Sequence, residues 1–600
     1  MKDFFKYMTA TICGIIVLTI IGGILFALTL MGMLASSDTK VKAKENSVFV
    51  LKLNGMVEER SEDDNPLNTL LGSTGLEEMG LDDILKAIRL ARDEENIKGI
   101  YLEGGTATFD SPATAQQIRD ALADFQKSGK WIYAYGDQFM QACYYVCSVA
   151  DSLFLNSTGM IDFKGLGGKG YYMTGLYEKL GIKYKAARVG KYKSYVESVT
   201  RKDMSAEDRE QREAMLKGIW QQWTEQMAQS RNLSAARLDS LANDSIMLFA
   251  SVSDYKQAGL IDRDFFPEEM KNVVRRTLKL EKDECINQLT LADMLSLKPA
   301  KKVKEKGGQV AVYYAYGEII DELVSGFASG HSIVGTTTVA DLQQLAKDDD
   351  VKAVVLRVNS GGGSAVASEQ IWHAIEQLKT KKPVVVSMGG MAASGGYMIS
   401  CGANYIFAEP STVTGSIGIF GLIPNFSGLV TDKLGITWDG VTTNKYSDYE
   451  TDLIFTQENS DEMRFLQGYT DRGYERFLEI VGSGRNMTKD EVNEIAQGRV
   501  WLATDALGIN LVDELGSLDD ALKKAAELAK TDEYHTASYP AKTDWIDNLL
   551  SSDKDKKAGS YLDSQLHQAL GDLYEPIMQL RQDQMRNRLQ ARLPYSINVK

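Results

Sequence analysis

The chain has 600 residues, too many for one compact core, and its length predicts at least two domains. Its composition is that of an ordinary globular protein, and a formal net charge of −15 argues against a protein that binds nucleic acid. Five scattered cysteines without a CxxC pair predict neither a disulfide framework nor a metal site. We therefore expect no metal ion, and no motif indicates a cofactor.

Residues 1–45 form the first predicted unit. No charged residue occurs from Tyr7 to Ser37, and about 20 apolar residues are enough to span a bilayer. The alternative is a long signal peptide cut near Ala35, although the apolar core of such a peptide is only about 7–15 residues. We expect a single membrane-spanning helix. Lysines on both sides of the segment leave its orientation open.

The rest of the chain contains an internal repeat. Three pairs of segments match at the constant spacing that separates Ile97 from Val351, and a fourth pair lies close to that spacing. The pairs are NIKGIYLEGG (from Asn96) with DVKAVVLRVNSGG (from Asp350), LGIKYKAARVGKYKS (from Leu180) with LGITWDGVTTNKYSD (from Leu434), SRNLSAARL (from Ser230) with GRNMTKDEV (from Gly484), and VFVLKLNGMVEE (from Val48) with VAVYYAYGEIID (from Val310). A shift this constant indicates a tandem duplication.

The repeat predicts the domain organisation. We expect one repeat over residues 46–299, a cationic linker over 300–308, and a second repeat over 309–535. Short β-branched stretches such as AVVLRV, PVVVSM and YIFA alternate with helical patterns such as VADLQQLAK and SEQIWHAIEQLK. This alternation predicts an α/β fold with a largely parallel sheet in each repeat. Residues 536–600 fall outside the repeat, and their periodicity predicts a helical C-terminal extension.

Two glycine-rich turns follow predicted strands in the second repeat. SMGGMAASGGYMIS (387–400) places Ser394 at the start of a helix of small residues, and NSGGGS (359–364) follows another strand. Because the carboxyl ends of parallel strands meet at one edge of a sheet, N–H groups of Gly395 and of Gly362 or Gly363 could point at one oxyanion. The alternative is that both clusters only permit tight turns and close helix packing. A phosphate-binding loop is a poor fit, because the lysine of such a loop is missing.

A serine hydroxyl needs a base to act as a nucleophile. The chain has four histidines, and none stands in an Asp-His or Cys-His setting. A lysine or a carboxylate remains, and a lysine can serve if burial lowers its pKa towards the working pH. RVGKYKSYVES (188–198) offers Lys191 and Lys193, for which an ordinary surface position is the alternative.

Taken together, MGGMAASGGY, the NSGGG turn, TGSIG (414–418) and GKYKS resemble the long, tandem-repeat form of signal peptide peptidase A. The resemblance extends from the apolar N-terminus to about residue 530. It implies tandem duplicated ClpP/crotonase-like domains and a Ser/Lys dyad. By this resemblance Ser394 is the nucleophile and Lys193 the general base. Ser416 would hydrogen-bond the lysine amine, and Gly395 and Gly363 would donate to the oxyanion.

The duplication offers a test within the sequence itself. Aligning KWIYAYGDQFMQACYY with KPVVVSMGGMAASGG places Ala142 opposite Ser394, and aligning GKYKS with NKYSD places Ser447 opposite Lys193. Each repeat lacks the residue that the other keeps, so we expect one active site between the two. The family usually has a proline where this chain has Gly361, which leaves the turn less preset.

The resemblance also implies a biological role. It implies a membrane-anchored serine endopeptidase that degrades remnant signal peptides after their release from secreted precursors. It further implies the bacterial inner membrane, with a single span and an extracytoplasmic (periplasmic) catalytic body, and a homo-oligomer, expected to be a tetramer. The dyad could form within one chain or between neighbouring chains. A crotonase-type acyl-CoA enzyme and a catalytically inert membrane scaffold are the competing functions.

Overall fold

The computed structural model describes residues 41–61, 78–244, 247–282, 284–297, 307–322, 331–455, 460–542 and 590–592, with residues 7, 14, 21 and 22. The predicted membrane span, Tyr7–Ser37, lies almost wholly outside the described residues, as does most of the predicted linker. Within the described part of the chain, no helix combines the length and the apolar composition that a bilayer crossing requires.

The first repeat is built on a six-stranded sheet in which every strand pair is parallel, as the alternation of strands and helices predicted. Its strands, in spatial order, are β10 (Asn287–Leu289), β1 (Ser47–Lys52), β4 (Ile97–Glu103), β6 (Trp131–Phe139), β7 (Ser152–Ile161) and β9 (Arg263–Asp264). Side chains alternate between the two faces of these strands. Phe49 packs in the large core with α3 (Leu81–Asp93) and α4 (Pro112–Gln126), whereas its neighbour Val48 packs against α11 (Pro267–Leu278).

The second repeat has the same central order in a larger sheet. Its strands are β20 (Val500–Leu502), β18 (Val413–Gly415), β16 (Val384–Ala393), β14 (Val351–Ser360), β11 (Gly308–Tyr316) and β22 (Tyr534–Tyr539). β17 (Tyr405–Ala408) also pairs with β16, and β21 (Glu514–Leu515) pairs with β17. Helices α13 (Gly335–Lys347) and α14 (Ala365–Lys379) cover one face, and α20 (Leu518–Leu528) covers the other. The predicted boundary at residue 535 falls inside β22, so the sheet continues past it. Most of the predicted helical extension lies outside the described residues.

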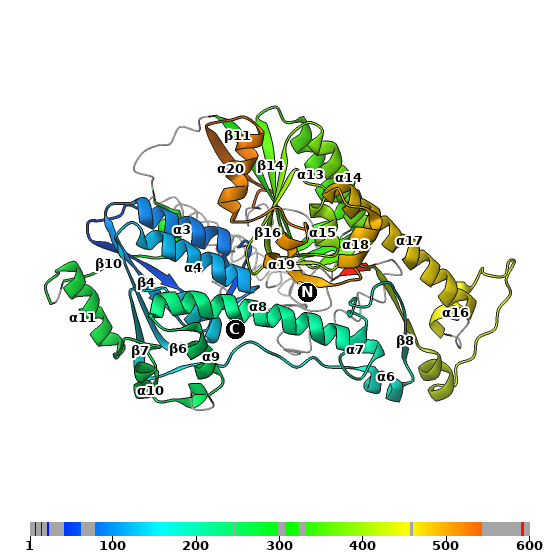
Figure 1. Ribbon diagram of the computed structural model, residues 1–600, viewed down its shortest axis with the longest axis horizontal. Helices are drawn as coiled ribbons and strands as arrows, with labels where there is room; N and C mark the ends of the chain where they lie inside the picture. Colours follow the sequence, from blue (N-terminus) through cyan, green and yellow to red (C-terminus); the bar gives the residue numbers. More distant parts are fainter. Residues whose placement is uncertain are drawn as a thin grey trace.

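A third sheet joins the two repeats. Its order is β13 (Ser332–Val334), β12 (Glu318–Ile320), β15 (Gly362–Ser364), β23 (Gln590–Arg592), β19 (Phe420–Asn425) and β8 (Lys183–Arg188). Strand β8 belongs to the first repeat and pairs antiparallel with β19 of the second. Figure 1 shows α8 (Ala206–Arg231) extending from the first repeat towards α7 (Glu197–Thr200) and β8, so one long helix follows the same crossing.

A buried polar cluster fixes the contact between the repeats. Arg357, near the end of β14, is 1% exposed and its Nε lies 2.6 Å from a carboxylate oxygen of Glu59 in the first repeat. It also donates to Gln117 of α4 at 2.9 Å. Asn359 donates to Asp110 at 2.8 Å. A buried charge of this kind is tolerated only when it is paired and hydrogen-bonded, so the cluster holds the first repeat against the strand that leads into the NSGGG turn.

Candidate active site

Ser394 lies between β16 and the short helix α15 (Gly395–Ser400), as the sequence predicted. Its backbone has φ 56° and ψ −116°, a conformation that non-glycine residues rarely adopt and that costs about 1–3 kcal/mol. The surrounding chain holds it there, because its N–H donates to the carbonyl of Gly415 at 2.8 Å and its carbonyl accepts from Met398 at 2.9 Å. The strained turn therefore keeps the hydroxyl at the carboxyl end of a central strand. It lies next to the first N–H groups of α15, which have no hydrogen-bond partner within the helix.

Lys193 reaches this serine from the first repeat. Its Nζ lies 2.7 Å from Ser394 Oγ, 3.1 Å from Ser416 Oγ and 3.0 Å from the carbonyl oxygen of Ser416. All three residues are fully buried. The structure thus brings together within one chain the three side chains that the resemblance named. Lys191, the other candidate lysine, is exposed, and its ammonium lies over the ring of Tyr192.

The environment of Lys193 favours a neutral amine. Burial lowers its pKa well below the ordinary value for lysine. The oxygens within hydrogen-bond distance of its Nζ belong to hydroxyl and carbonyl groups, with no carboxylate among them in the described part of the chain. Two glycines pack closely against the aliphatic part of the Lys193 side chain. If Gly498 carried a Cβ, that atom would lie 2.7 Å from Lys193 Cβ, and a Cβ on Gly418 would lie 3.3 Å from Lys193 Cδ. A neutral amine at this distance can accept the serine proton.

The residues that hold the lysine segment were not predicted from the sequence. Ser194, the neighbour of Lys193, donates to Asp208 at 2.6 Å, and Gln211 donates to the carbonyl of Tyr192 at 3.1 Å. Both partners lie in the first turns of α8. Gln211 also accepts from the N–H of Val500 in β20 at 3.1 Å, which ties the segment to the second repeat. The only available signal was an N-terminal capping pattern, Ser205 to Asp208, which marks the start of a helix and carries no chemistry.

The glycine-rich turn meets the start of α15. A Cβ on Gly362 would lie 2.6 Å from the amide nitrogen of Gly395, and φ at Gly362 is +98°, so a side chain is excluded here on both grounds. The N–H of Gly362 already donates to Ser360 Oγ at 3.1 Å. Gly363 lies next in the turn and packs on the backbone of Ile319. Gly395 and Gly363 remain the predicted oxyanion donors, and the structure places their segments side by side.

Among its described residues, the first repeat has no equivalent site. The residue that precedes α5 (Gln141–Cys147), as Ser394 precedes α15, is Met140, and the predicted counterpart Ala142 lies inside the helix instead. The alignment was displaced because the strand and the turn differ in length between the repeats. Cys143 is fully buried, and burial raises the pKa of its thiol to about 12. Neither Ala142 nor Cys143 therefore provides a nucleophile.

A fully buried amine against a serine hydroxyl, beside glycine amides at a helix N-terminus, is the site of a serine protease. The model of Peptidase family S49 matches this chain twice, over residues 124–282 and 376–532, and that of Clp protease matches residues 328–412. The chain therefore belongs to Peptidase family S49, which confirms the resemblance to signal peptide peptidase A and the duplication.

Individual relatives support this assignment. Protease 4 of Salmonella typhi is 36% identical over 520 residues, which cover 84% of this chain and 82% of that protein. Protease 4 of Haemophilus influenzae is 33% identical over 587 residues, 94% and 92% of the two chains. A protein of Enterococcus faecium named putative signal peptide peptidase SppA is 32% identical over 308 residues, 45% of this chain and 88% of that one.

Proposed function

We propose that this serine protease is a membrane-anchored endopeptidase that degrades remnant signal peptides, with Ser394 as nucleophile and Lys193 as general base. The observation that carries the proposal is the 2.7 Å separation of Lys193 Nζ and Ser394 Oγ in a fully buried setting. The two residues come from different repeats, and neither repeat holds both. An arrangement that needs the whole duplicated chain is difficult to explain by packing alone.

The geometry supports the following course of reaction. Neutral Lys193 accepts the proton of Ser394 as the oxygen attacks the carbonyl carbon of a peptide bond. Glycine N–H groups stabilise the oxyanion of the tetrahedral intermediate. Lys193 then donates its proton to the leaving amine, and a water molecule, activated by the same amine, hydrolyses the acyl-enzyme. Ser416 hydrogen-bonds the amine throughout and orients it towards Ser394.

The substrate and the location rest on the sequence and on the relatives. The uncharged segment Tyr7–Ser37 suits a single anchor in the bacterial inner membrane, and the resemblance places the catalytic body on its periplasmic side. A body held at the bilayer surface would meet peptides that remain in the membrane. The name of the Enterococcus faecium relative, putative signal peptide peptidase SppA, is consistent with this substrate.

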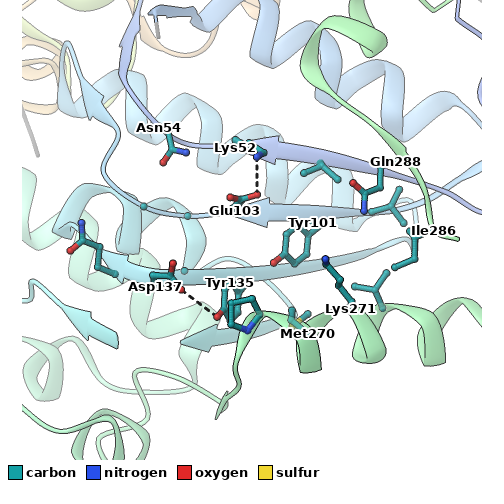
Figure 2. A pocket seen from close by; sticks show the side chains of 18 of the residues that line it. Lys52, Asn54, Tyr101, Glu103, Tyr135, Asp137, Met270, Lys271, Ile286 and Gln288 are labelled. Atoms are coloured by element: carbon teal, nitrogen blue, oxygen red, sulfur yellow. Dashed lines mark hydrogen bonds and ion pairs between the residues drawn. The ribbon is translucent and has the colours of Figure 1, made fainter. Parts of the chain in front are cut away.

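A homo-oligomer, with four copies by the resemblance, is supported by an uncovered surface on the first repeat. By strand register, Lys52 and Glu103 of the first repeat correspond to Tyr314 and Arg357 of the second. In the second repeat these positions are covered by the first repeat of the same chain. In the first repeat Lys52 and Glu103 instead line a cavity of about 520 Å³, shown in Figure 2. A second copy could cover it as the first repeat covers its counterpart.

Hydrolysis of a synthetic signal peptide by the full-length protein in lipid vesicles tests the proposed function. The wild-type protein should cleave the peptide, Ser394→Ala and Lys193→Ala should not, and the matched control Lys191→Ala should retain wild-type activity. Cleavage by either active-site variant at more than a few per cent of the wild-type rate would remove that residue from its role. Hydration of an enoyl-CoA with no peptide cleavage would favour the crotonase-type enzyme instead.

A further inference from the structure

The strand that leads to Ser394 bulges where it passes Asn359. On either side of Asn359 the register of β14 against β16 shifts, so that Asn359 alone lies opposite residues 389–391 of β16. A bulge interrupts the ladder of backbone hydrogen bonds and re-aims the chain that follows it, and bulges of this kind are frequent beside active sites. The groups that hold this bulge therefore decide where the Ser394 hydroxyl points.

The side chain of Asn359 supplies a hydrogen bond that the interrupted ladder lacks. Its Oδ1 accepts from the N–H of Met391 at 3.1 Å, three residues before Ser394. The carbonyl of Gly389, at the other end of the bulge, accepts from Thr412 Oγ1 at 2.6 Å. Because an unpaired backbone group away from water costs free energy, these two side chains favour one shape of the bulge.

The first repeat fixes the orientation of the Asn359 amide. The Asn359 Nδ2 donates to Asp110 at 2.8 Å and to Glu59 at 3.2 Å. With both acceptors on this side, the amide nitrogen faces the first repeat, and the amide oxygen is left to accept from Met391. The constant spacing of the repeat places Gly105 opposite Asn359, so the first repeat has no side chain for the equivalent bond.

The backbone of the bulge also lies directly against the first repeat. A Cβ on Gly389 would lie 2.7 Å from a carboxylate oxygen of Glu59, and a Cβ on Gly390 would overlap with Ser111 Oγ. Only glycine therefore lets β16 approach the first repeat this closely. The two glycines that precede Ser394 serve the contact between the repeats, in contrast to Gly395, which begins the helix after it.

We propose that Asn359 is a positioning residue, which transmits the contact with the first repeat to the bulge of β16 and so fixes the direction of Ser394. The inference rests on the proposed function, because it concerns the serine proposed as the nucleophile. The first repeat then acts on the reaction in two ways, through the base Lys193 and through its support of the nucleophile. A displacement of the reacting atoms by about 1 Å can lower a rate about a hundredfold, so the loss of this support is measurable.

The first test is Asn359→Ala in the full-length protein. It removes both hydrogen bonds and should lower kcat for a fluorogenic peptide about a hundredfold with little change in KM. The pH at which kcat is half-maximal should stay that of the wild type, because Lys193 remains buried. Asn272→Ala, at an exposed position of α11, is the matched control and should keep the wild-type kcat.

Two results would overturn the proposal. One is a wild-type kcat in Asn359→Ala. The other is a half-maximal pH that rises towards the ordinary range of lysine, because it would show that the variant only loosens the contact that buries Lys193.

A reciprocal exchange tests whether the first repeat supplies the orientation. Asn359→Asp keeps an oxygen for the N–H of Met391 but places a third carboxyl group beside Asp110 and Glu59, so kcat should fall about as far as in Asn359→Ala. Adding Asp110→Asn restores a donor and an acceptor in reversed order, and kcat should recover at least about tenfold. No recovery, with both proteins folded by circular dichroism, would overturn the role of the first repeat. Retained hydrolysis in Ser394→Ala would instead refute the proposed function.

Discussion

The two repeats share one architecture, but among the described residues only the second places a serine between its central strand and the following short helix. The helices α14 and α4 are both capped by a serine, Ser364 and Ser111, which aligns the residues before them. Where the second repeat has Gly362 and Gly363, the first has Phe109 and Asp110. The Phe109 side chain is fully buried in the apolar core of the first repeat. The difference shows that the first repeat has exchanged a reactive turn for core packing.

The first repeat retains the base, Lys193, and places it in the active site of the second repeat. Strand β8 pairs with β19 of the second repeat, and the segment after β8 carries Lys193 to Ser394. The corresponding segment of the second repeat, around Ser447, is exposed and makes no such crossing. Duplication thus allowed each half to lose a different part of the dyad, and the intact site depends on the contact between them.

The largest effect is expected when the nucleophile is removed from the second repeat and a hydroxyl is introduced at the corresponding position of the first. Ser394→Ala should reduce kcat/KM at least about a thousandfold, because the attacking oxygen is lost. Adding Met140→Ser, which places a hydroxyl before α5, should restore nothing, because Lys193, although it belongs to the first repeat, is held against residue 394 of the second. The measurement is hydrolysis of a fluorogenic peptide. Recovery of activity in the double variant would show that the first repeat holds a working site.

The glycine turn should be the next most sensitive feature. Gly362→Ala introduces a Cβ at φ +98° that would approach the Gly395 amide, and it should lower kcat about a hundredfold by displacing an oxyanion donor. Gly175→Ala is the matched control, since a Cβ there meets no atom within 4 Å. Equal activity in the two variants would show that the glycine turn has no role in catalysis. Circular dichroism of both proteins checks that the fold is retained.

A smaller effect is expected at Ser416. Ser416→Ala removes one of the three oxygens around Lys193 Nζ but leaves the Ser416 carbonyl in place. We expect kcat to fall about tenfold with little change in KM, because the amine is less well oriented while the peptide site is untouched. Steady-state kinetics on one peptide measure both constants. A change confined to KM would contradict a role in positioning the lysine.

The smallest expected effect concerns the contact between the repeats. Burial, reinforced by the charge of Glu59, raises the pKa of Asp110 from 3.8 to about 7. Between these values the folded chain keeps a proton that the unfolded chain has released, so the contribution of this carboxyl to stability falls as pH rises. Asp110→Asn should therefore stabilise the protein by about 1 kcal/mol, a few degrees in Tm, at pH 8, and by less at pH 5. The same change in Tm at both pH values would contradict this account.

The sequence predicted the dyad because its residues lie in short, contiguous motifs. The strand preceding Ser394 and the glycines around it are contiguous, and the resemblance of these motifs and of GKYKS to signal peptide peptidase A assigned Lys193 as the base. The spacing of the repeat then placed Ser447 opposite Lys193. The α/β class followed for the same reason, since alternating strands and helices are local patterns. The proposed oxyanion donors also came from contiguous motifs.

Contacts between distant segments produce no such local pattern in the sequence. β23 has only three residues, too few to show alternation, and its place beside β15 depends on a pairing across more than 200 positions. The ion pair of Glu59 with Arg357 and the support of Lys193 by Gln211 likewise depend on tertiary packing. Isolated charged or amide side chains carry no periodic signal, so the sequence predicted neither contact.

The most direct test of the composite site is the pH dependence of covalent labelling by a fluorophosphonate, with the modified residue mapped by mass spectrometry. Because burial lowers the pKa of Lys193, the labelling rate should rise with pH and level off well below the usual lysine range. The account predicts a single adduct on Ser394, formed at least a hundredfold more slowly in Lys193→Ala. An adduct on another residue, or an equal rate in Lys193→Ala, would contradict it.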